Sequence, residues 1–424
     1  MTNSLKTTPL YKWHKEANAN MADFGGFNMP LWYETGVKNE HLGVLKSAGI
    51  FDTSHMVCIN VKGKDSFELL NYCFTRDLES LVTGRCIYGA FLDINGYCID
   101  DAIIYKFSES FFMICVNAGM GETIARHLLE NQKNLDVEIE DLSGKFAKLD
   151  IQGINSARIL SSLIKNPDMI FNKMPYFSFK GNFNESIFGD SLVQLLDNTP
   201  ILLSRSGYTG EFGFEIFINP NSIVKLWEDI LTAGKDFGIT ACGLGARDSL
   251  RAGACLPLSH QDIGKWKFIN HPWEFALAFN KDKTSFTKDF LGSHALLPNN
   301  CDSFIYPFVG DSLRKILPGK DTQVIDKTDK IIGKVLTCVT DMGISWKNGD
   351  IISINSQNIP EDFKIKGLSC GFVMVSKELD ESSIKKASDT RLTLKEGKRS
   401  IKVTIVKDIR PDRTARKKLA NFIN

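Results

Sequence analysis

Two adjacent carboxylates, Asp100 and Asp101, lie inside an otherwise apolar run that extends from Tyr97 to about Phe107. The dipeptide Asn95-Gly96 separates this run from an earlier β-rich stretch. Asn-Gly between two such runs is the strongest short signal for a hairpin, because both central residues of a type I′ turn need a positive φ. The run is therefore predicted to be the second strand of a hairpin, with Asp101 on one apolar face and Asp100 on the other.

On a strand that is apolar on both faces, an ionised aspartate is energetically unfavourable. Burying such a charge costs several kcal/mol unless it is paired or hydrogen-bonded. At least one of Asp100 and Asp101 is therefore expected to have a specific partner. The pattern fits a structural carboxylate that holds a loop or an arginine as well as it fits a functional acid.

The overall composition excludes several classes of protein. With 51 Lys and Arg against 50 Asp and Glu, the net charge is +1, so no global field attracts nucleic acid or a membrane. None of the ten cysteines forms a CxxC pair, which argues against a zinc or redox site and for a reducing compartment. The N-terminus lacks an apolar signal region, and no long uncharged apolar run occurs, so the chain is expected to be cytoplasmic.

The order of predicted elements divides the 424 residues into two regions. Two βαβ-like passages, residues 57–135 and 146–235, resemble a duplicated α+β unit. After residue 297 short strands alternate with polar loops, which is typical of a small barrel or sandwich. The predicted regions are residues 1–297 and 302–424, with a break at Pro298-Asn299-Asn300-Cys301, where proline and asparagine favour a turn.

Beside the aspartates, two further segments carry candidate functional residues. Glu215 is predicted on a strand that follows the glycine-rich bend 207–213, and Arg247 on a helix over residues 243–254. His55 follows a serine, but no glycine elbow surrounds that serine, so we expect a structural histidine with its hydrogen bonds satisfied.

Several motifs in a fixed order resemble the aminomethyltransferase, or T-protein, of the glycine cleavage system. The resemblance covers nearly the whole chain and is strongest from Thr8 to about Leu296. The motifs are Phe51-Asp-Thr-Ser-His-Met56, Ile99-Asp-Asp101, Asn117-Ala-Gly119, Gly207-Tyr-Thr-Gly-Glu211 with Gly213-Phe-Glu215, Gly245-Ala-Arg-Asp-Ser-Leu-Arg251, and Phe290-Leu-Gly-Ser-His-Ala-Leu296.

This resemblance implies an α+β fold: two ferredoxin-like α+β domains and a C-terminal β-barrel around a central tetrahydrofolate site. Asp101 matches the catalytic aspartate, and Glu215 and Arg247 match folate contacts. No metal is implied. The other matching positions line the folate pocket: Met56, Tyr88, Asn117 and Tyr208.

The implied reaction moves a one-carbon unit to tetrahydrofolate. An aminomethyl group arrives on the lipoyl arm of H-protein, N5 of the folate attacks its carbon, and ammonia and methylene-tetrahydrofolate leave. Asp101 is expected to stabilise developing positive charge and to orient or accept a proton. The Glu215 carboxylate is expected to accept two hydrogen bonds from a pterin, and Arg247 to bind the folate carboxylates or to bridge to Asp248 and a neighbouring acid.

Some segments depart from the family pattern and leave the one-carbon donor open. The family usually has Leu-Glu-Ala-Gly followed by Tyr-Gly-x-Asp, whereas this chain has Leu250-Arg-Ala-Gly253 and then Ser259-His-Gln-Asp262. Trp273 stands in a third altered segment. The alternatives are a tetrahydrofolate-dependent demethylase, that is, a methyltransferase that moves the methyl group of a small N-, S- or O-methylated compound to folate, and a non-catalytic folate-binding protein. The last is disfavoured because Ser206-Gly-Tyr-Thr-Gly-Glu211 stands where its relatives have Lys-Gly-Cys-x-x-Gly-Gln-Glu.

The C-terminal segment 408–418 is rich in arginine and lysine and lacks the apolar finish that is usual in the family. A charged run of this kind is expected to be a solvated terminus. Contact with an acidic partner or with a folate polyglutamate is the alternative.

Overall fold

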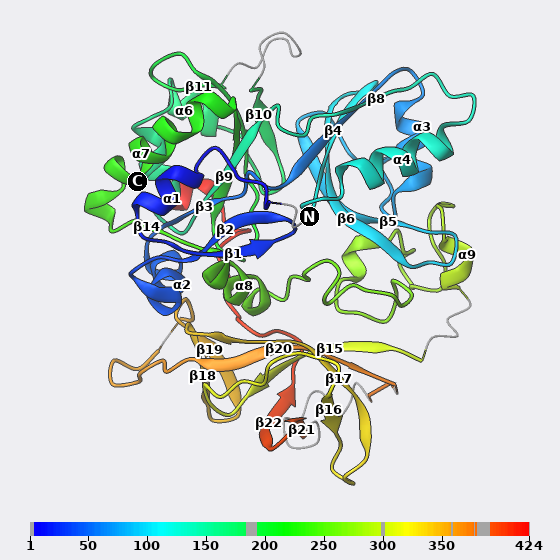
Figure 1. The fold of residues 1–424 in the computed structure, drawn as a ribbon, viewed down its shortest axis with the longest axis vertical. Helices are drawn as coiled ribbons and strands as arrows, with labels where there is room; N and C mark the ends of the chain where they lie inside the picture. The colour runs from blue at the N-terminus through cyan, green and yellow to red at the C-terminus, as the bar shows by residue number, and fades with distance from the viewer. Residues whose placement is uncertain are drawn as a thin grey trace.

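The computed structural model describes residues 4–183, 193–297, 302–357, 359–376, 378–379 and 391–423. Two α+β parts lie side by side, and a β-barrel lies below both of them in the view of Figure 1. This arrangement confirms the predicted fold class. The predicted break at residues 298–301 lies outside the described residues.

The first α+β part is built on a five-stranded antiparallel sheet that contains the paired aspartates. Its helices α3 (Ser66–Cys73) and α4 (Gly121–Gln132) bury Leu69, Leu70, Ile124 and Leu128 against one face of the sheet. In spatial order the strands are β5 (Arg85–Leu92), β6 (Cys98–Ser108), β7 (Phe111–Val116), β4 (Val57–Lys62) and β8 (Glu138–Asp141).

The second part repeats this plan with a longer sheet. The strands in spatial order are β10 (Phe179–Gly181), β12 (Pro200–Ser204), β13 (Gly213–Ile218), β9 (Ala147–Gln152), β3 (Gly49–Asp52) and β14 (Thr240–Ala241), and β11 (Val193–Gln194) pairs with β12. The helices are α5 (Ser156–Ser161), α6 (Pro167–Phe171) and α7 (Ile223–Ala233), which packs Trp227 into the core.

The opposite faces of the two sheets pack against each other. Tyr105 of β6 lies beside Phe179 of β10 and Phe217 of β13, with ring centroids 5.2 and 5.7 Å apart. Met56 packs on the same apolar cluster. This interface brings residues from β6 and β13 together although more than 100 residues separate them in the chain.

The N-terminal elements lie beside the second α+β part, and helix α8 lies between them and the barrel (Figure 1). These elements are α1 (Tyr11–Glu16), β1 (Asn20–Phe24), β2 (Phe27–Trp32), α2 (Gly36–Lys46) and α8 (Leu244–Gly253). The shorter elements are η1 (Pro220–Ser222), η2 (Lys235–Phe237), η3 (Glu274–Ala276), α9 (Ser293–Leu296) and η4 (Leu419–Phe422). None of the helices in the described part of the chain has the length and apolarity needed to cross a membrane.

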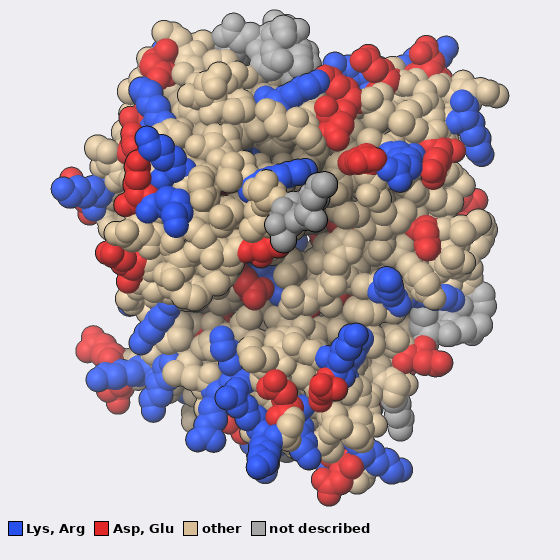
Figure 2. All heavy atoms as spheres, in the orientation of Figure 1, with Lys and Arg blue, Asp and Glu red and all other residues tan. Residues whose placement is uncertain are grey.

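The C-terminal region forms a closed barrel, with a separate hairpin attached to it. Barrel strands in order are β15 (Phe304–Gly310), β20 (Leu368–Val375), β17 (Ile331–Asp341), β16 (Thr322–Ile325), β21 (Arg391–Glu396) and β22 (Arg399–Ile405). The hairpin consists of β18 (Ile344–Lys347) and β19 (Asp350–Ser353). Many lysine and arginine side chains gather on the visible face of the barrel (Figure 2).

The hairpin before β6 forms, but the predicted type I′ turn is wrong. Of the central pair, only Gly96 has a positive φ, +79°. The Asp93 carboxylate accepts hydrogen bonds from the backbone N–H groups of Asn95 and Tyr97, at 2.9 and 3.0 Å. These bonds stabilise a wider loop, because an aspartate side chain competes for backbone donors that a two-residue turn would leave to the strands.

The expectation of a solvated C-terminal tail is also wrong. Arg410, Thr414, Leu419 and Phe422 are buried, and the Phe422 ring stacks on Phe212 with centroids 4.2 Å apart. The basic residues at 416–418 remain exposed. Apolar and hydrogen-bonding residues spaced between the basic ones anchor the tail in the core of the second α+β part.

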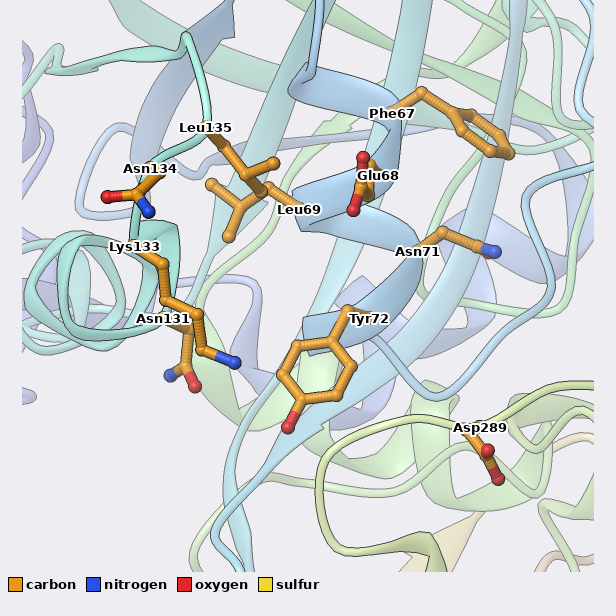
Figure 3. Close-up of a pocket in the computed structure, with 10 residues that line it drawn as sticks. All are labelled: Phe67, Glu68, Leu69, Asn71, Tyr72, Asn131, Lys133, Asn134, Leu135 and Asp289. Carbon is orange, nitrogen blue, oxygen red and sulfur yellow. The ribbon is translucent and has the colours of Figure 1, made fainter.

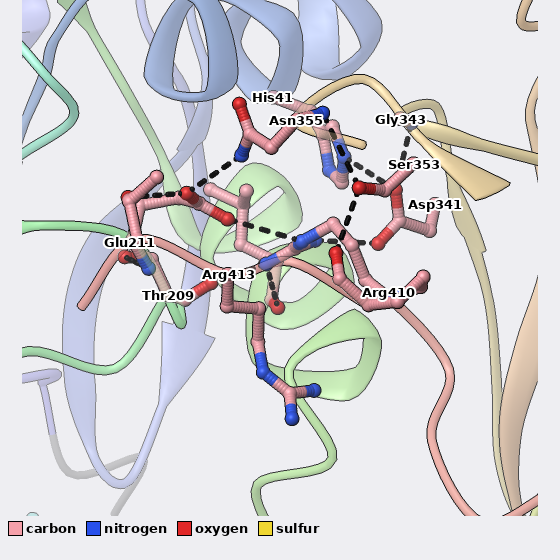
Figure 4. Close-up of polar contacts among 12 residues, drawn as sticks. His41, Thr209, Glu211, Asp341, Gly343, Ser353, Asn355, Arg410 and Arg413 are labelled. Carbon is pink, nitrogen blue, oxygen red and sulfur yellow. Dashed lines mark hydrogen bonds and ion pairs between the residues drawn. The ribbon is translucent and has the colours of Figure 1, made fainter. Parts of the chain in front are cut away.

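A buried polar network around Arg410 joins the tail, the barrel, helix α2 and the Leu250 carbonyl of helix α8 (Figure 4). The Arg410 guanidinium pairs with Asp341 of β17 at 2.5 Å and with Glu211 at 3.2 Å. His41 of α2 contacts the other Asp341 oxygen at 3.0 Å. Thr414 donates to Glu211 at 2.6 Å. The charges of Arg410 and His41 hold the pKa of Asp341 below its ordinary value although burial alone would raise it.

Replacing Arg410 with methionine is expected to lower the free energy of unfolding by about 3–5 kcal/mol, because Asp341 and Glu211 then remain buried without their cation. Urea denaturation monitored by tryptophan fluorescence measures this change. Lys418→Met, at an exposed position, is the control and is expected to stay within about 0.5 kcal/mol of wild type. Equal denaturation midpoints for the two variants would show that the network does not stabilise the fold.

Candidate active site

Asp101 lies on β6 between two hydrogen-bond donors from neighbouring strands. Asn117, just after β7, donates from Nδ2 to Asp101 Oδ1 at 2.7 Å, and the Tyr88 hydroxyl on β5 donates to Oδ2 at 2.7 Å. Asp101 is 8% exposed. The structure thus brings together three of the residues that the sequence predicted for the site, and two donors fix the orientation of the carboxylate.

Asp100 is fully buried and has its own set of partners. Its carboxylate accepts from the Asn117 backbone N–H at 3.0 Å, from Asn117 Nδ2 at 2.9 Å and from Ser259 Oγ at 2.9 Å. His260 Nε2 lies 3.7 Å from Asp100 Oδ1. Burial, followed by the neighbouring charge of Asp101, raises the pKa of Asp100 to about 7. Both aspartates therefore have specific partners, as expected from their burial.

Glu215 on β13 faces a buried lysine that was not predicted from the sequence. Lys148 Nζ on β9 lies 2.7 Å from Glu215 Oε1 and 2.6 Å from Asp150 Oδ1. Ser206 donates to the other Glu215 oxygen at 2.5 Å. The available signal was a lysine and an aspartate two residues apart in the apolar run 147–152, where each charge needs a buried partner.

Arg247 extends this group of charges from helix α8. Its Nη1 lies 2.7 Å from Asp150 Oδ2, so the neighbouring acid it bridges to is Asp150, while Asp248 pairs with Arg251. The Arg247 guanidinium also lies over the Tyr208 ring, 4.9 Å from its centroid, in a cation–π arrangement. The Tyr208 hydroxyl donates to the carbonyl of Pro257.

The Asp101 group and the Arg247 group adjoin each other. Burial raises the pKa of Tyr208 above its ordinary value, and the charge of Asp101 adds to this effect. Burial, followed by the charge of Asp101, likewise raises the pKa of Tyr88. Met56 lies in the apolar cluster around Tyr105, whose hydroxyl is 3.4 Å from Glu215 Oε2. The seven predicted residues therefore fall into two contact groups, one around Asp101 and one around Glu215 and Arg247, with Met56 in the apolar cluster beside Glu215.

His55 differs from expectation. It is buried, but its Nδ1 has no hydrogen-bond partner among the described residues, so the prediction of a satisfied histidine is wrong. Burial, with a smaller contribution from the charge of Arg247, lowers the pKa of His55 to about 4, which keeps the imidazole neutral. The ring instead packs edge-on against Phe24, with centroids 5.3 Å apart.

The segments that depart from the family pattern fall into two groups. Arg251 is fully buried, pairs with Asp262 and donates to Thr337 of the barrel at 3.0 Å. Trp273 is also fully buried and donates to the carbonyl of Cys255 at 2.9 Å. These residues pack the core. Ser259 and its neighbour His260 form the second group, because they contact the Asp100 carboxylate.

A separate surface hollow of about 720 Å³ lies between α3 and the segment 131–135 (Figure 3). Tyr72, Asn71 and Lys133 are among its lining residues. None of the seven predicted site residues lines it, so it is a different feature from the cluster around Asp101.

Comparisons with known proteins agree with this geometry. The family model described as the GCVT N-terminal domain matches residues 10–281, more than half of the chain. The chain belongs to the glycine cleavage T-protein family. It is thereby an enzyme, a transferase of the aminomethyltransferase group. The recognition of this family from its motifs is confirmed.

Individual relatives cover most of the chain. The aminomethyltransferase of Caldanaerobacter subterraneus subsp. tengcongensis is 39% identical over 69% of this chain and 73% of its own length. That of Lysinibacillus sphaericus is 34% identical over 84% of this chain and 92% of its own length. The crystal structure of the glycine cleavage system aminomethyltransferase T from Bartonella henselae superposes with a TM-score of 0.73 and 25% identity, covering 98% of this chain and 99% of that one.

The raised pKa of Asp100 predicts a pH-dependent difference in stability between wild type and Asp100→Asn. The folded pKa of about 7 lies above the ordinary value of 3.8, so the stability tied to the protonated carboxyl is present below about pH 4 and lost as pH rises through 7. Thermal melts from pH 4 to 8 should show wild type losing stability relative to Asp100→Asn. The exposed Asp289→Asn is the control, and a constant difference between wild type and Asp100→Asn would contradict the assignment.

Proposed function

We propose that this protein transfers a one-carbon unit from aminomethyl-loaded, lipoylated H-protein to tetrahydrofolate, with release of ammonia. The observation that carries the proposal is the Asp101 carboxylate, buried and oriented by Tyr88 and Asn117 beside the Glu215 and Arg247 group. The aminomethyltransferase names of the relatives support the same reaction. Asp101 is proposed as the catalytic residue.

The residues present fit tetrahydrofolate. Glu215 and Asp101 provide carboxylate acceptors for pterin N–H groups, and Arg247 provides a cation for a folate carboxylate. The remaining pocket residues supply apolar and aromatic surface: Met56, Tyr88 and Tyr208. The orphaned Nδ1 of buried His55 is a further polar atom that a ligand can satisfy.

Tetrahydrofolate supplies the nucleophilic nitrogen that receives the one-carbon unit. Asp101 has two oxygens, each holding one protein hydrogen bond, so each retains a lone pair that can stabilise positive charge or accept a proton. Tyr88 and Asn117 hold the carboxylate in place before the reaction, which reduces the reorganisation needed during transfer. Burial of Asp101 limits the water that would compete for these lone pairs.

A product assay tests this proposal directly. Purified protein is incubated with tetrahydrofolate and aminomethyl-loaded H-protein, and folates are separated by chromatography. Methylene-tetrahydrofolate with equimolar ammonia is the expected result. Methyl-tetrahydrofolate formed only from methylated amines, sulfonium compounds or aryl ethers would instead show a demethylase, and folate binding without any turnover would show a binding protein.

Asp101→Asn is expected to bind tetrahydrofolate within a few-fold of wild type, because asparagine keeps the shape of the side chain and can still accept from Tyr88. The transfer rate is expected to fall about 100-fold or more, because the negative charge and the proton acceptor are lost. Stopped-flow turnover and calorimetric binding measure the two effects. Near-normal turnover would remove Asp101 from the mechanism, and Asp289→Asn is the surface control.

A further inference from the structure

The two proposed folate contacts, Glu215 and Arg247, do not touch each other but are joined through two other buried charges. Arg247 contacts Asp150, Asp150 contacts Lys148, and Lys148 contacts Glu215, at 2.7, 2.6 and 2.7 Å. The signs alternate along this row, and its two cations balance its two anions. The inner pair, Lys148 and Asp150, belongs to none of the motifs that resemble the family.

Strand geometry explains how Lys148 and Asp150 reach Glu215. Lys148 and Asp150 are two residues apart on β9 and therefore share one face of the sheet. On the neighbouring strand β13, Glu215 is the register partner of Asp150. Side chains opposite each other across strands are close neighbours, and two carboxylates in such a pair repel. The Lys148 ammonium lies between Asp150 and Glu215 and removes this repulsion.

All donors of Lys148 are used within the protein. An ammonium group has three N–H bonds. Nζ contacts Asp150 Oδ1 at 2.6 Å, Glu215 Oε1 at 2.7 Å and Thr53 Oγ1 at 3.2 Å, and the side chain is 1% exposed. Burial alone would lower the pKa of Lys148, but the two carboxylates raise it above its ordinary value, so the lysine is charged. Lys148 therefore has no N–H left for a ligand.

We propose that Lys148 is a positioning residue of the folate site, which holds the Glu215 carboxylate in the orientation that receives the pterin. This inference rests on the proposed function. Lys148 donates to Glu215 Oε1, and Ser206 and Tyr105 donate to Oε2, so the carboxylate is held in one orientation and Oε1 keeps a lone pair for a ligand. Through Asp150, the same lysine fixes the acid that orients Arg247.

Loss of Lys148 leaves Glu215 beside Asp150 without a cation between them. Glu215 then either turns away from Asp150 or takes up a proton, and in both cases it accepts fewer hydrogen bonds from a pterin. The reacting atoms near Asp101 are not involved. The expected effect is therefore a higher Kd and KM for tetrahydrofolate with a much smaller change in kcat.

The test measures tetrahydrofolate binding by calorimetry, and kcat and KM by product formation, for a set of variants. Lys148→Met is expected to raise Kd about 10- to 100-fold, the range for a lost hydrogen bond to a charged group. Lys106→Met is the matched control, because Lys106 is also a buried lysine, yet pairs with the exposed carboxylate of Glu109. Its Kd is expected to equal that of wild type.

A double-mutant cycle separates positioning from a general loss of stability. If Lys148 acts through Glu215, adding Lys148→Met to Glu215→Gln should raise Kd less than about threefold further, whereas independent effects would multiply. The variant Lys148→Met/Asp150→Asn removes one charge of each sign, which protects folding if the single variant is unstable. It is also expected to bind weakly, because Glu215 still lacks its Lys148 hydrogen bond and Arg247 loses the Asp150 charge.

A tetrahydrofolate Kd equal to that of wild type, in Lys148→Met or in the charge-balanced double variant, would overturn the positioning role. It would leave the proposed function intact. Multiplicative effects in the cycle would also overturn it. Failure of the wild-type protein to bind tetrahydrofolate would overturn the proposed function and this inference together. The wild-type measurement therefore distinguishes failure of the function from failure of the positioning role alone.

Discussion

Buried ion pairs between segments that are distant in sequence hold the site residues in place. Lys148 and Asp150 join β9 to β13 and α8, and Arg410 joins the C-terminal tail to the barrel. Removing charges from water is expensive, so each pair is favourable only while its geometry is kept. The placement of the second α+β part, α8, the tail and the barrel depends on this condition, because a shift of any of them leaves a buried charge unpaired.

Local patterns in the sequence were sufficient to predict the fold class. Period-two apolar strands, amphipathic helices and the change in composition after residue 297 indicated the two α+β parts and the barrel, and the ordered motifs identified the family. Of the motif residues, Asp101 contacts Asn117, and Glu215 is joined to Arg247 through Lys148 and Asp150. Motifs were informative in this chain because a binding site requires particular side chains, whereas a core tolerates many apolar combinations.

The features that could not be predicted depend on contacts across the chain. Nothing near Lys148 indicates that its partner is Glu215, 67 residues later. The burial of the basic tail depends on Phe212 and Asp341, which contact the tail in the folded protein but are distant from it in the sequence. The turn before β6 was mispredicted for a local reason, because the Asp93 side chain outcompetes the Asn-Gly preference. Sequence patterns therefore predict helices and strands, whereas the contacts between their side chains depend on tertiary packing.

The positions of the unusual residues also bear on the reaction. Arg251 stands where the family has a glutamate, yet its charge is neutralised by Asp262 and Asp248 and its side chain reaches the barrel, so this change alters how α8 packs. Ser259 and His260 differ in kind, since they contact the carboxylate next to Asp101. His260 also adopts a φ of +62°, a conformation that is strained for a residue with a side chain. Of the residues that depart from the family pattern, Ser259 and His260 are therefore the ones that contact the carboxylate beside the proposed catalytic residue, whereas Arg251 and Trp273 pack the core.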